Sequence, residues 1–391
     1  MARSLAHIER IAALDPLPGY DRVVYATVLG WKVIVRKDDF QVGDLAVYFE
    51  CDSLLPKEEW CSFMEAKHYR VKIQKMCKVY SQGLLIPLHA FYKDEAPDWI
   101  KLAEEGDDVT EILGVKYYEP EDNIRKAEVN PNVKYNAMAA RHKKLFQKKP
   151  IRWLMKREWG KKLLFLFFGK RKDKPLEFPS KFAFIHKTDE ERVENMPWVL
   201  QDKQPWIKTT KVDGTSVTYI LERKAFGRYE FYICSRNRRI LTLDQNCYHD
   251  ENVYWEMAQK YAIEAKLKDI LKAHHEWAYV CLQGEIAGPG VQKNPHGLKD
   301  VQLFGFNFID SIKGRWNSVT ARDYMAEYDI PWVPIVDTKY ILPDDLEELK
   351  LSADGPCEVP GSSGLREGYV YRTYDGKQSF KNVSREYMMK H

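Results

Sequence analysis

Short β-rich runs with glycine turns fill both ends of this 391-residue chain, and an irregular, charged stretch lies between them. The N-terminal part contains RVVYATVLGWKVIVRKDDF, VGDLAVYFECDSLLP and YRVKIQKMCKVYSQGLLIPL. The C-terminal part combines further runs of this kind with helical patterns. The sequence therefore predicts an α+β protein in three parts: a small β-barrel at 1–95, a basic linker or insert at 96–175, and a larger domain at 176–391.

The predicted barrel at residues 1–95 has two interpretations. Short strands separated by turn signals are typical of small barrels, and an OB-fold is one candidate. OB-folds often bind single strands or duplex backbones, so the barrel could contact nucleic acid directly. The alternative is that it only docks on the domain that follows.

One long helix is predicted over NVYWEMAQKYAIEAKLKDILKAHH in the C-terminal part. Its apolar residues recur at i, i+3, i+4 and i+7, which directs one face toward a core. That face comprises Tyr254, Met257, Ala258, Tyr261, Ala262 and Ala265. We interpret its aromatic rings as core residues rather than as platforms for nucleic-acid bases.

Positive charge is concentrated in the middle of the chain. Residues 141–174 hold fourteen Lys and Arg against two acidic residues, a net +12 that leaves the rest at −8 out of a total of +4. Trp and Phe alternate with these cations, so the stretch could neutralise phosphates and stack on bases. Three other interpretations stay open: a solvated linker, a localisation signal, and a helix lying on a membrane surface.

The distribution of cysteines and apolar residues indicates an intracellular protein. None of the seven cysteines forms a C-x-x-C pair, which argues against a zinc ribbon or a disulfide framework. The N-terminal segment lacks the apolar core of a signal peptide. The longest apolar run, at 163–168, is far below the roughly 20 residues that span a bilayer. We expect a soluble protein of the cytoplasm or nucleus, with no membrane partner and no stable protein partner.

A lysine in the stretch IKTTKVDGTS begins an ordered set of motifs. Taken alone, Lys211 before an Asp-Gly turn is an ordinary hairpin feature. Five further polar or aromatic positions follow it in the motifs SRN, GE, FGFN, EGYV and SFK, each in or beside a strand-like run. They are Arg236, Glu285, Phe306, Glu367 and Lys381. Rigid strands could direct all of them into one pocket.

In this order the motifs resemble motifs I, Ia, III, IIIa, IV and V of the covalent nucleotidyltransferases, which are the polynucleotide ligases and mRNA-capping guanylyltransferases. The stretches FIHKTDEERVEN and LPGYDRVVYATVLGWKVIV narrow the resemblance to RNA ligase family 5, the nick-sealing branch with an N-terminal OB domain. The resemblance implies an OB-fold followed by an ATP-grasp-like adenylyltransferase domain of antiparallel sheets with flanking helices. Because only ten residues follow Lys381, we expect no further C-terminal domain.

The resemblance implies a role for each motif residue. Lys211 is the nucleophile that carries AMP. Glu367 binds the catalytic metal, and Lys381 holds the α-phosphate. Glu285 accepts hydrogen bonds from the ribose hydroxyls, and Phe306 stacks on adenine.

Secondary candidates and departures from the family pattern follow from the same resemblance. Arg236 is expected to hold the phosphate of AMP or of the nick, and Lys293 is a further phosphate candidate. Thr210 is the cofactor-binding position where many RNA ligases carry an acid, so base choice could rest on backbone groups. Asn307 stands where an Asp is common. We interpret His296 as a residue of a surface loop.

The resemblance implies ATP and Mg²⁺ or Mn²⁺ as cofactors, and nicked duplex RNA or an RNA/DNA hybrid as the partner. The expected reaction joins a 3′-hydroxyl to a 5′-phosphate through a lysyl-AMP and an adenylylated 5′-end. Two alternatives remain. The chain could be a DNA or mixed-strand nick ligase, or it could bind nucleic acid with an inactive transferase pocket.

Overall fold

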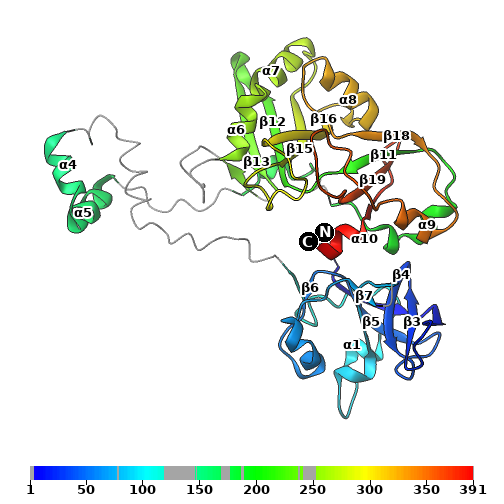
Figure 1. Ribbon diagram of the computed structural model, residues 1–391. Helices are drawn as coiled ribbons and strands as arrows, with labels where there is room; N and C mark the ends of the chain where they lie inside the picture. The colour runs from blue at the N-terminus through cyan, green and yellow to red at the C-terminus, as the bar shows by residue number, and fades with distance from the viewer. Residues whose placement is uncertain are drawn as a thin grey trace.

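A computed structural model of the chain shows an N-terminal unit, a helical hairpin and a C-terminal unit (Figure 1). It describes residues 4–76, 79–118, 146, 148–168, 177–185, 189–236, 238–240 and 252–390. Residues 119–145, 147 and 169–175 of the predicted linker, and part of the motif stretches FIHKTDEERVEN and SRN, lie outside the described residues. Among the described helices, none is both long enough and apolar enough to cross a bilayer.

The N-terminal unit consists of short antiparallel strands. Its strands are β1 (Ala6–Arg10), β2 (Ala13–Pro16), β3 (Val23–Val28), β4 (Trp31–Arg36), β5 (Leu45–Phe49), β6 (Ser53–Leu54), β7 (Gln74–Met76), β8 (Val79–Ser81), β9 (Leu84–Pro87) and β10 (Lys116–Tyr117). Its short helices are η1 (Glu59–Lys67), η2 (Leu88–Phe91) and α1 (Asp98–Lys101). Strand β5 lies between β1 and β9, and β3 lies between β2 and β4. The alternating burial of β3 and β4 reflects the two-residue period of strands that cover a core on one side.

The N-terminal unit extends beyond residue 95, where the sequence predicted its end. Strand β10 pairs with β6, aligning Lys116 with Leu54. Val109 and Val115 are buried in the same apolar cluster as Ile8 and Phe49. Residues up to Tyr118 therefore pack with the barrel strands rather than with the basic stretch.

The described part of the basic stretch forms a hairpin of α4 (Lys149–Met155) and α5 (Glu158–Phe168). Its small core contains Phe146 and Leu164, with Leu154 and Phe168 packed against them. In Figure 1 this hairpin stands apart from both larger units.

The C-terminal unit contains two antiparallel sheets. The six-stranded sheet has the order β14-β13-β12-β15-β16-β17, and the four-stranded sheet has the order β18-β11-β19-β20. Its strands are β11 (Trp206–Lys211), β12 (Thr215–Arg223), β13 (Tyr229–Ser235), β14 (Arg239–Ile240), β15 (Tyr279–Ala287), β16 (Gln302–Asp310), β17 (Gly314–Arg315), β18 (Ile335–Tyr340), β19 (Gly368–Thr373) and β20 (Ser379–Val383). Its helices are η3 (Ser180–Phe182), η4 (Val193–Asn195), η5 (Pro197–Gln201), η6 (Ala225–Gly227), α6 (Val253–Lys260), α7 (Ile263–Ala273), α8 (Ser318–Ala326), α9 (Leu346–Leu351) and α10 (Arg385–Lys390). The predicted antiparallel sheets with flanking helices are confirmed.

The two sheets face each other across the site described below. The outer face of the six-stranded sheet is buried under α6, α7 and α8 in the largest apolar cluster of the described residues. Its other face meets the four-stranded sheet, because Arg372 of β19 donates a hydrogen bond of 2.9 Å to the Asn307 side chain of β16. The back of the four-stranded sheet packs its own core around Trp206, Tyr371 and Phe380.

The predicted single helix at residues 252–275 is two helices. The chain breaks at Ala262, whose φ of 51° is left-handed, and α7 then starts in a new direction. Met257 and Ala258 are buried as predicted, whereas Ala262 and Ala265 are exposed. The apolar period of α7 instead buries Ile263, Leu267, Ile270 and Leu271. The sequence predicted one continuous helix because no Gly or Pro marks the break at Ala262.

The N-terminal unit docks on the C-terminal unit through the segment that precedes η5. The Gly30 amide donates to the Glu194 carbonyl at 2.7 Å, and the Trp31 indole donates to Asn195 at 2.5 Å. The side-chain amide of Asn195 in turn donates a hydrogen bond of 2.7 Å to the Glu50 carboxylate. The barrel therefore docks on the C-terminal unit through these residues, and this contact does not decide whether the barrel also binds nucleic acid.

Candidate active site between the two sheets

The side chains of Lys211 and Glu367 form an ion pair at the end of the four-stranded sheet. Lys211 is the last residue of β11 and aligns with Gly368, the first residue of β19. The antiparallel register thus brings together two side chains that are 156 residues apart. The Lys211 Nζ lies 2.5 Å from Glu367 Oε1, and the two side chains are 28% and 13% exposed.

The charges around Lys211 favour its ammonium form. Burial alone would lower the pKa of the amine, but the carboxylates of Glu367, Asp213 and Glu285 outweigh burial and raise it. A nucleophilic amine has to be neutral, so this arrangement holds the lysine in place without activating it. Activation requires that the negative charge around the amine be compensated.

Two further carboxyl groups near Lys211 are difficult to ionise. Burial raises the pKa of Glu285 to about 8, with the charge of Glu367 adding to the effect and Lys211 opposing it. Burial together with Glu367 raises the pKa of Asp213 to about 6. Carboxyls crowded in this way gain most from a cation, and raised carboxyl pKa values of this kind are common at functional sites.

The turn after Lys211 is held by two residues that sequence reasoning did not assign to it. The Asp213 amide donates a hydrogen bond of 2.8 Å to His296 Nε2, and the Tyr387 hydroxyl donates to the Asp213 carboxylate. His296 is fully buried, so its interpretation as a surface-loop residue was wrong. Tyr387 belongs to α10, in the last residues of the chain. Only the polar character of these residues signalled a role, because neither lies in a recognised motif.

Gly214 completes the turn at a point where no side chain fits. A Cβ at this position would lie 2.2 Å from the Ile286 carbonyl oxygen of β15. Close approach of this backbone keeps β12 paired with β15, and the register aligns Ser216 with Glu285. Glycine is therefore required here by packing, which places Glu285 beside the lysine turn.

Lys381 lies on the same face of the four-stranded sheet as Lys211. Thr209, Val370 and Lys381 align across β11, β19 and β20, and Lys211 is the next residue along β11 on that face. The Lys381 amide donates to the Glu191 carbonyl at 2.7 Å, which fixes the strand at this point.

Phe306 stands at a β-bulge on the facing sheet. Gln283 aligns with Asn307 and Gly284 with Gly305, so Phe306 is the extra residue of β16. Its half-buried ring packs against the cluster that contains Val212, next to the lysine. A bulge redirects a side chain out of the regular pleat, and here it presents an aromatic ring at the wall of the site.

The structure accounts for the Asn at position 307. The side-chain oxygen of Asn307, Oδ1, accepts a hydrogen bond of 2.9 Å from Arg372. Its side-chain nitrogen, Nδ2, donates a hydrogen bond of 2.9 Å to Gln283 Oε1. Arg372 also forms an ion pair of 2.6 Å with Glu190. Asn307 therefore links the two sheets by hydrogen bonds. Glu190 supplies Arg372 with the negative charge that an Asp at position 307 would provide.

Three predicted residues remain, and of these the charge of Arg236 acts on Glu285. Thr210 is buried on the opposite face of its strand, and its hydroxyl donates to Glu358 at 3.1 Å. Arg236 is exposed and forms an ion pair with Asp189. Lys293 is exposed in a loop where three consecutive residues, 292–294, have left-handed φ values. Such strain is concentrated at functional sites in many proteins.

The carboxylates fit a divalent cation. Glu367 Oε2 is buried and has no hydrogen-bond partner among the described residues. No group of three or more His, Cys, Asp or Glu within the described ranges could hold a metal by itself. Magnesium is often held by one or two carboxylates together with water and substrate phosphates. Glu367, with Asp213 and Glu285 nearby, therefore suits a cation that shares its coordination with water and a phosphate.

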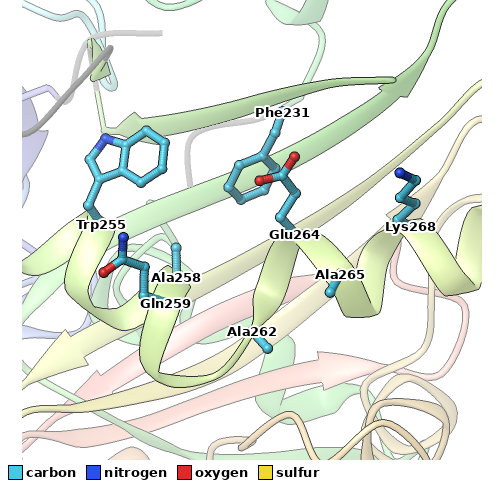
Figure 2. A pocket seen from close by; sticks show the side chains of 8 residues that line it. All are labelled: Phe231, Trp255, Ala258, Gln259, Ala262, Glu264, Ala265 and Lys268. Carbon is cyan, nitrogen blue, oxygen red and sulfur yellow. The ribbon is translucent and has the colours of Figure 1, made fainter. Parts of the chain in front are cut away.

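A separate hollow of about 360 Å³ lies between β13 and the helices α6 and α7 (Figure 2). Phe231 and Trp255 form its apolar side, and Gln259 and Lys268 also line it. None of the predicted site residues lines it, so it does not extend the site between the sheets.

Two segments of the chain match models of known protein domains. Residues 5–88 match the model of an OB-fold domain, and residues 204–390 match the model of the RNA ligase family. These matches confirm the predicted OB-fold and the predicted family resemblance. A search of curated proteins found no match.

Solved structures similar to this chain include several of Naegleria gruberi RNA ligase. An apo mutant has a TM-score of 0.74 and 25% identity over 100% of this chain and 99% of that one. A mutant with ATP and Mn has a TM-score of 0.74 and 26% identity, again over 100% and 99%. The form with pyrophosphate has a TM-score of 0.73 and 26% identity over the same shares of the two chains.

Proposed function

We propose that this chain, whose residues 204–390 belong to the RNA ligase family, is an ATP-dependent ligase that joins 3′-hydroxyl and 5′-phosphate ends at nicks in RNA duplexes. The observation that carries the proposal is the pair of Lys211 Nζ and Glu367 Oε1 at 2.5 Å, flanked by Asp213 and Glu285. The similar Naegleria structures with ATP, AMP and pyrophosphate support the choice of nucleotide.

In the first step the Lys211 amine attacks the α-phosphorus of ATP. A P–N bond forms, the bond to the β-phosphate oxygen breaks, and pyrophosphate leaves. At neutral pH an unperturbed lysine with a pKa of about 10.4 is protonated, which costs roughly 4 kcal/mol before it can attack. Glu367 would hold a divalent cation, whose positive charge would offset the carboxylates and favour the neutral amine.

The facing sheets then position the nucleotide. Lys381, on the face that carries Lys211, stabilises the charge that develops on the α-phosphate. Phe306 at its bulge stacks on adenine, and Glu285 accepts hydrogen bonds from the ribose hydroxyls. The Thr210 side chain is already bonded to Glu358 and its backbone amide to the Pro334 carbonyl, so we expect base choice to rest on other backbone groups.

The remaining two steps transfer AMP and seal the nick. The 5′-phosphate of the nick attacks the lysyl-AMP, which forms a P–O–P bond and releases Lys211. The 3′-hydroxyl then attacks the activated 5′-phosphate, so a phosphodiester bond forms and AMP leaves. Arg236 and Lys293 hold phosphates of the nicked strand, for which Arg236 must leave Asp189. A substrate of this kind places the enzyme inside the cell, in the cytoplasm or the nucleus.

Sealing assays on nicked duplexes test this proposal. Four substrates carry RNA or DNA independently on the 3′-hydroxyl and 5′-phosphate sides of the nick, each with ATP and Mg²⁺. We expect sealing wherever the 3′-hydroxyl side is RNA. Equal sealing of the all-DNA nick would instead identify a DNA or mixed-strand ligase. No sealing of any substrate, together with duplex binding, would indicate a binding protein with an inactive pocket.

A further inference from the structure

The hairpin of α4 and α5 exposes an apolar stripe that its own core does not use. Leu164 faces the hairpin core, while Trp159, Leu163, Leu166 and Phe167 lie one helical turn apart on the outer side of α5. Leu166 is 80% exposed and Phe167 is 75% exposed. Trp153 of α4 continues the stripe, with its ring centroid 6.1 Å from that of Trp159.

Cations surround this stripe. Arg152 and Lys162 are exposed on the two helices, Lys156 and Arg157 are exposed in the connection between them, and Lys161 forms an ion pair of 2.6 Å with Glu158. Glu158 is the only acidic residue in the hairpin, residues 148–168. A surface with several exposed cations around an apolar centre complements a partner that is anionic and apolar at once.

The geometry disfavours single-stranded RNA as this partner. RNA binding through aromatics requires free ring faces on which bases stack. The Arg157 guanidinium already covers the Trp153 ring, 3.4 Å from its centroid, and Trp159 meets the same ring edge-on at 82°. The most exposed position, Leu166, is aliphatic and offers no stacking surface, which leaves Phe167 and Trp159 as the exposed rings of the stripe.

We propose that this hairpin binds the surface of an anionic lipid bilayer, with the stripe inserted at the level of the headgroups and the cations paired with lipid phosphates and carboxylates. Helices that lie in the membrane interface combine Trp, Phe and Leu on one side with Lys and Arg around it. Apolar insertion and charge attraction act together, as the two signals that stable anchoring requires. The proposal takes up the membrane-surface interpretation that the sequence left open for this stretch, and it does not depend on ligase activity.

Vesicle flotation of the full chain tests the proposal. The vesicles contain phosphatidylcholine alone or phosphatidylcholine with phosphatidylserine. We expect the chain to float with the mixed vesicles at low salt and to be released as salt rises, because exposed charges are screened. Failure to float with the mixed vesicles, or equal flotation with both kinds, would overturn the proposal.

Two variants separate the apolar and the charge contributions. Leu166→Ser with Phe167→Ser should lower the partition into mixed vesicles by about tenfold or more, since burial of such side chains supplies the apolar part. Lys156→Glu with Lys162→Glu should remove the preference for the anionic lipid. The matched control is Phe226→Ser, which removes an aromatic ring that is 94% exposed on the C-terminal unit. It should float as the unchanged chain does.

A parallel measurement uses a labelled single-stranded RNA. Binding of that RNA that falls in the Leu166→Ser, Phe167→Ser variant, without any flotation of the unchanged chain, would assign the stripe to RNA and refute the lipid proposal. Flotation is measured without ATP or RNA, so its result is independent of whether the chain seals nicks.

Discussion

At the scale of single residues, the central feature is a lysine held in the wrong protonation state for attack. Glu367 and the neighbouring carboxyls raise the pKa of Lys211, and burial makes Glu285 and Asp213 reluctant to ionise. In the proposed mechanism, this opposition is the reason that attack by Lys211 would need a cation. A cation that takes up the charge of Glu367 removes the main cause that holds the proton on the lysine.

Tyr387 gives a prediction at this scale. Replacing it with Phe removes the hydroxyl that donates to Asp213, while the ring keeps its packing. We expect formation of the lysyl-AMP to slow by about tenfold, because a hydrogen bond to a charged group contributes roughly 1.5–3 kcal/mol. The rate is measured in a single turnover with labelled ATP.

The matched control for Tyr387 is Tyr374→Phe. The Tyr374 hydroxyl also donates one hydrogen bond, of 2.6 Å to the Thr338 carbonyl, but on the surface. We expect its rate to stay unchanged. Equal rates for the unchanged chain and Tyr387→Phe would show that the C-terminal helix does not position the lysine turn.

At the scale of elements, strand ends and turns assemble the site. Pairing of β11 with β19 joins Lys211 to Glu367, and pairing of β12 with β15 brings in Glu285. The order of the motifs predicted these residues because each motif lies in or beside a strand. It could not predict Tyr387 or His296, because their contacts depend on how distant loops and the last helix fold back onto the turn.

Gly214 gives a prediction at the scale of elements. In Gly214→Ala the new Cβ would meet the Ile286 carbonyl at 2.2 Å, so β12 must move away from β15 near Glu285. We expect labelling by ATP to fall by at least about a hundredfold, since small displacements of reacting groups have effects of that size. Gly227→Ala is the control: its φ of 68° makes the substitution strained, but nothing lies within 4 Å of the added Cβ and the strain falls outside the site, so labelling should stay normal. Normal labelling in both variants would contradict the packing argument.

At the scale of the whole molecule, the barrel and the transferase unit are joined by buried polar contacts. The Asn195 side chain forms hydrogen bonds with both the Trp31 indole and the Glu50 carboxylate, and the Arg385 guanidinium of α10 lies over the Tyr80 ring, 4.9 Å from its centroid. The division into a barrel, a basic stretch and an α+β domain was predictable from turn signals and charge. The extension of the barrel unit to Tyr118 was not, because β10 has only two residues and little strand signal.

Asn195 gives a prediction at the scale of the whole molecule. In Asn195→Ala the buried Trp31 and Glu50 lose a partner, so we expect the free energy of unfolding to fall by about 2–4 kcal/mol. Calorimetry should then show the first unfolding transition at a lower temperature. The control Gln204→Ala changes an exposed side chain and should unfold like the unchanged chain. If both variants unfold alike, the barrel does not depend on this contact.

The most direct test of the account is transfer of label from α-labelled ATP to the protein with Mg²⁺, followed by a denaturing gel. The unchanged chain should carry the label, and both Lys211→Ala and Glu367→Ala should carry none. Normal label on Glu367→Ala would remove this residue from the metal role. Label that survives in Lys211→Ala, or no label on the unchanged chain, would contradict the assignment of Lys211 as the AMP-carrying nucleophile.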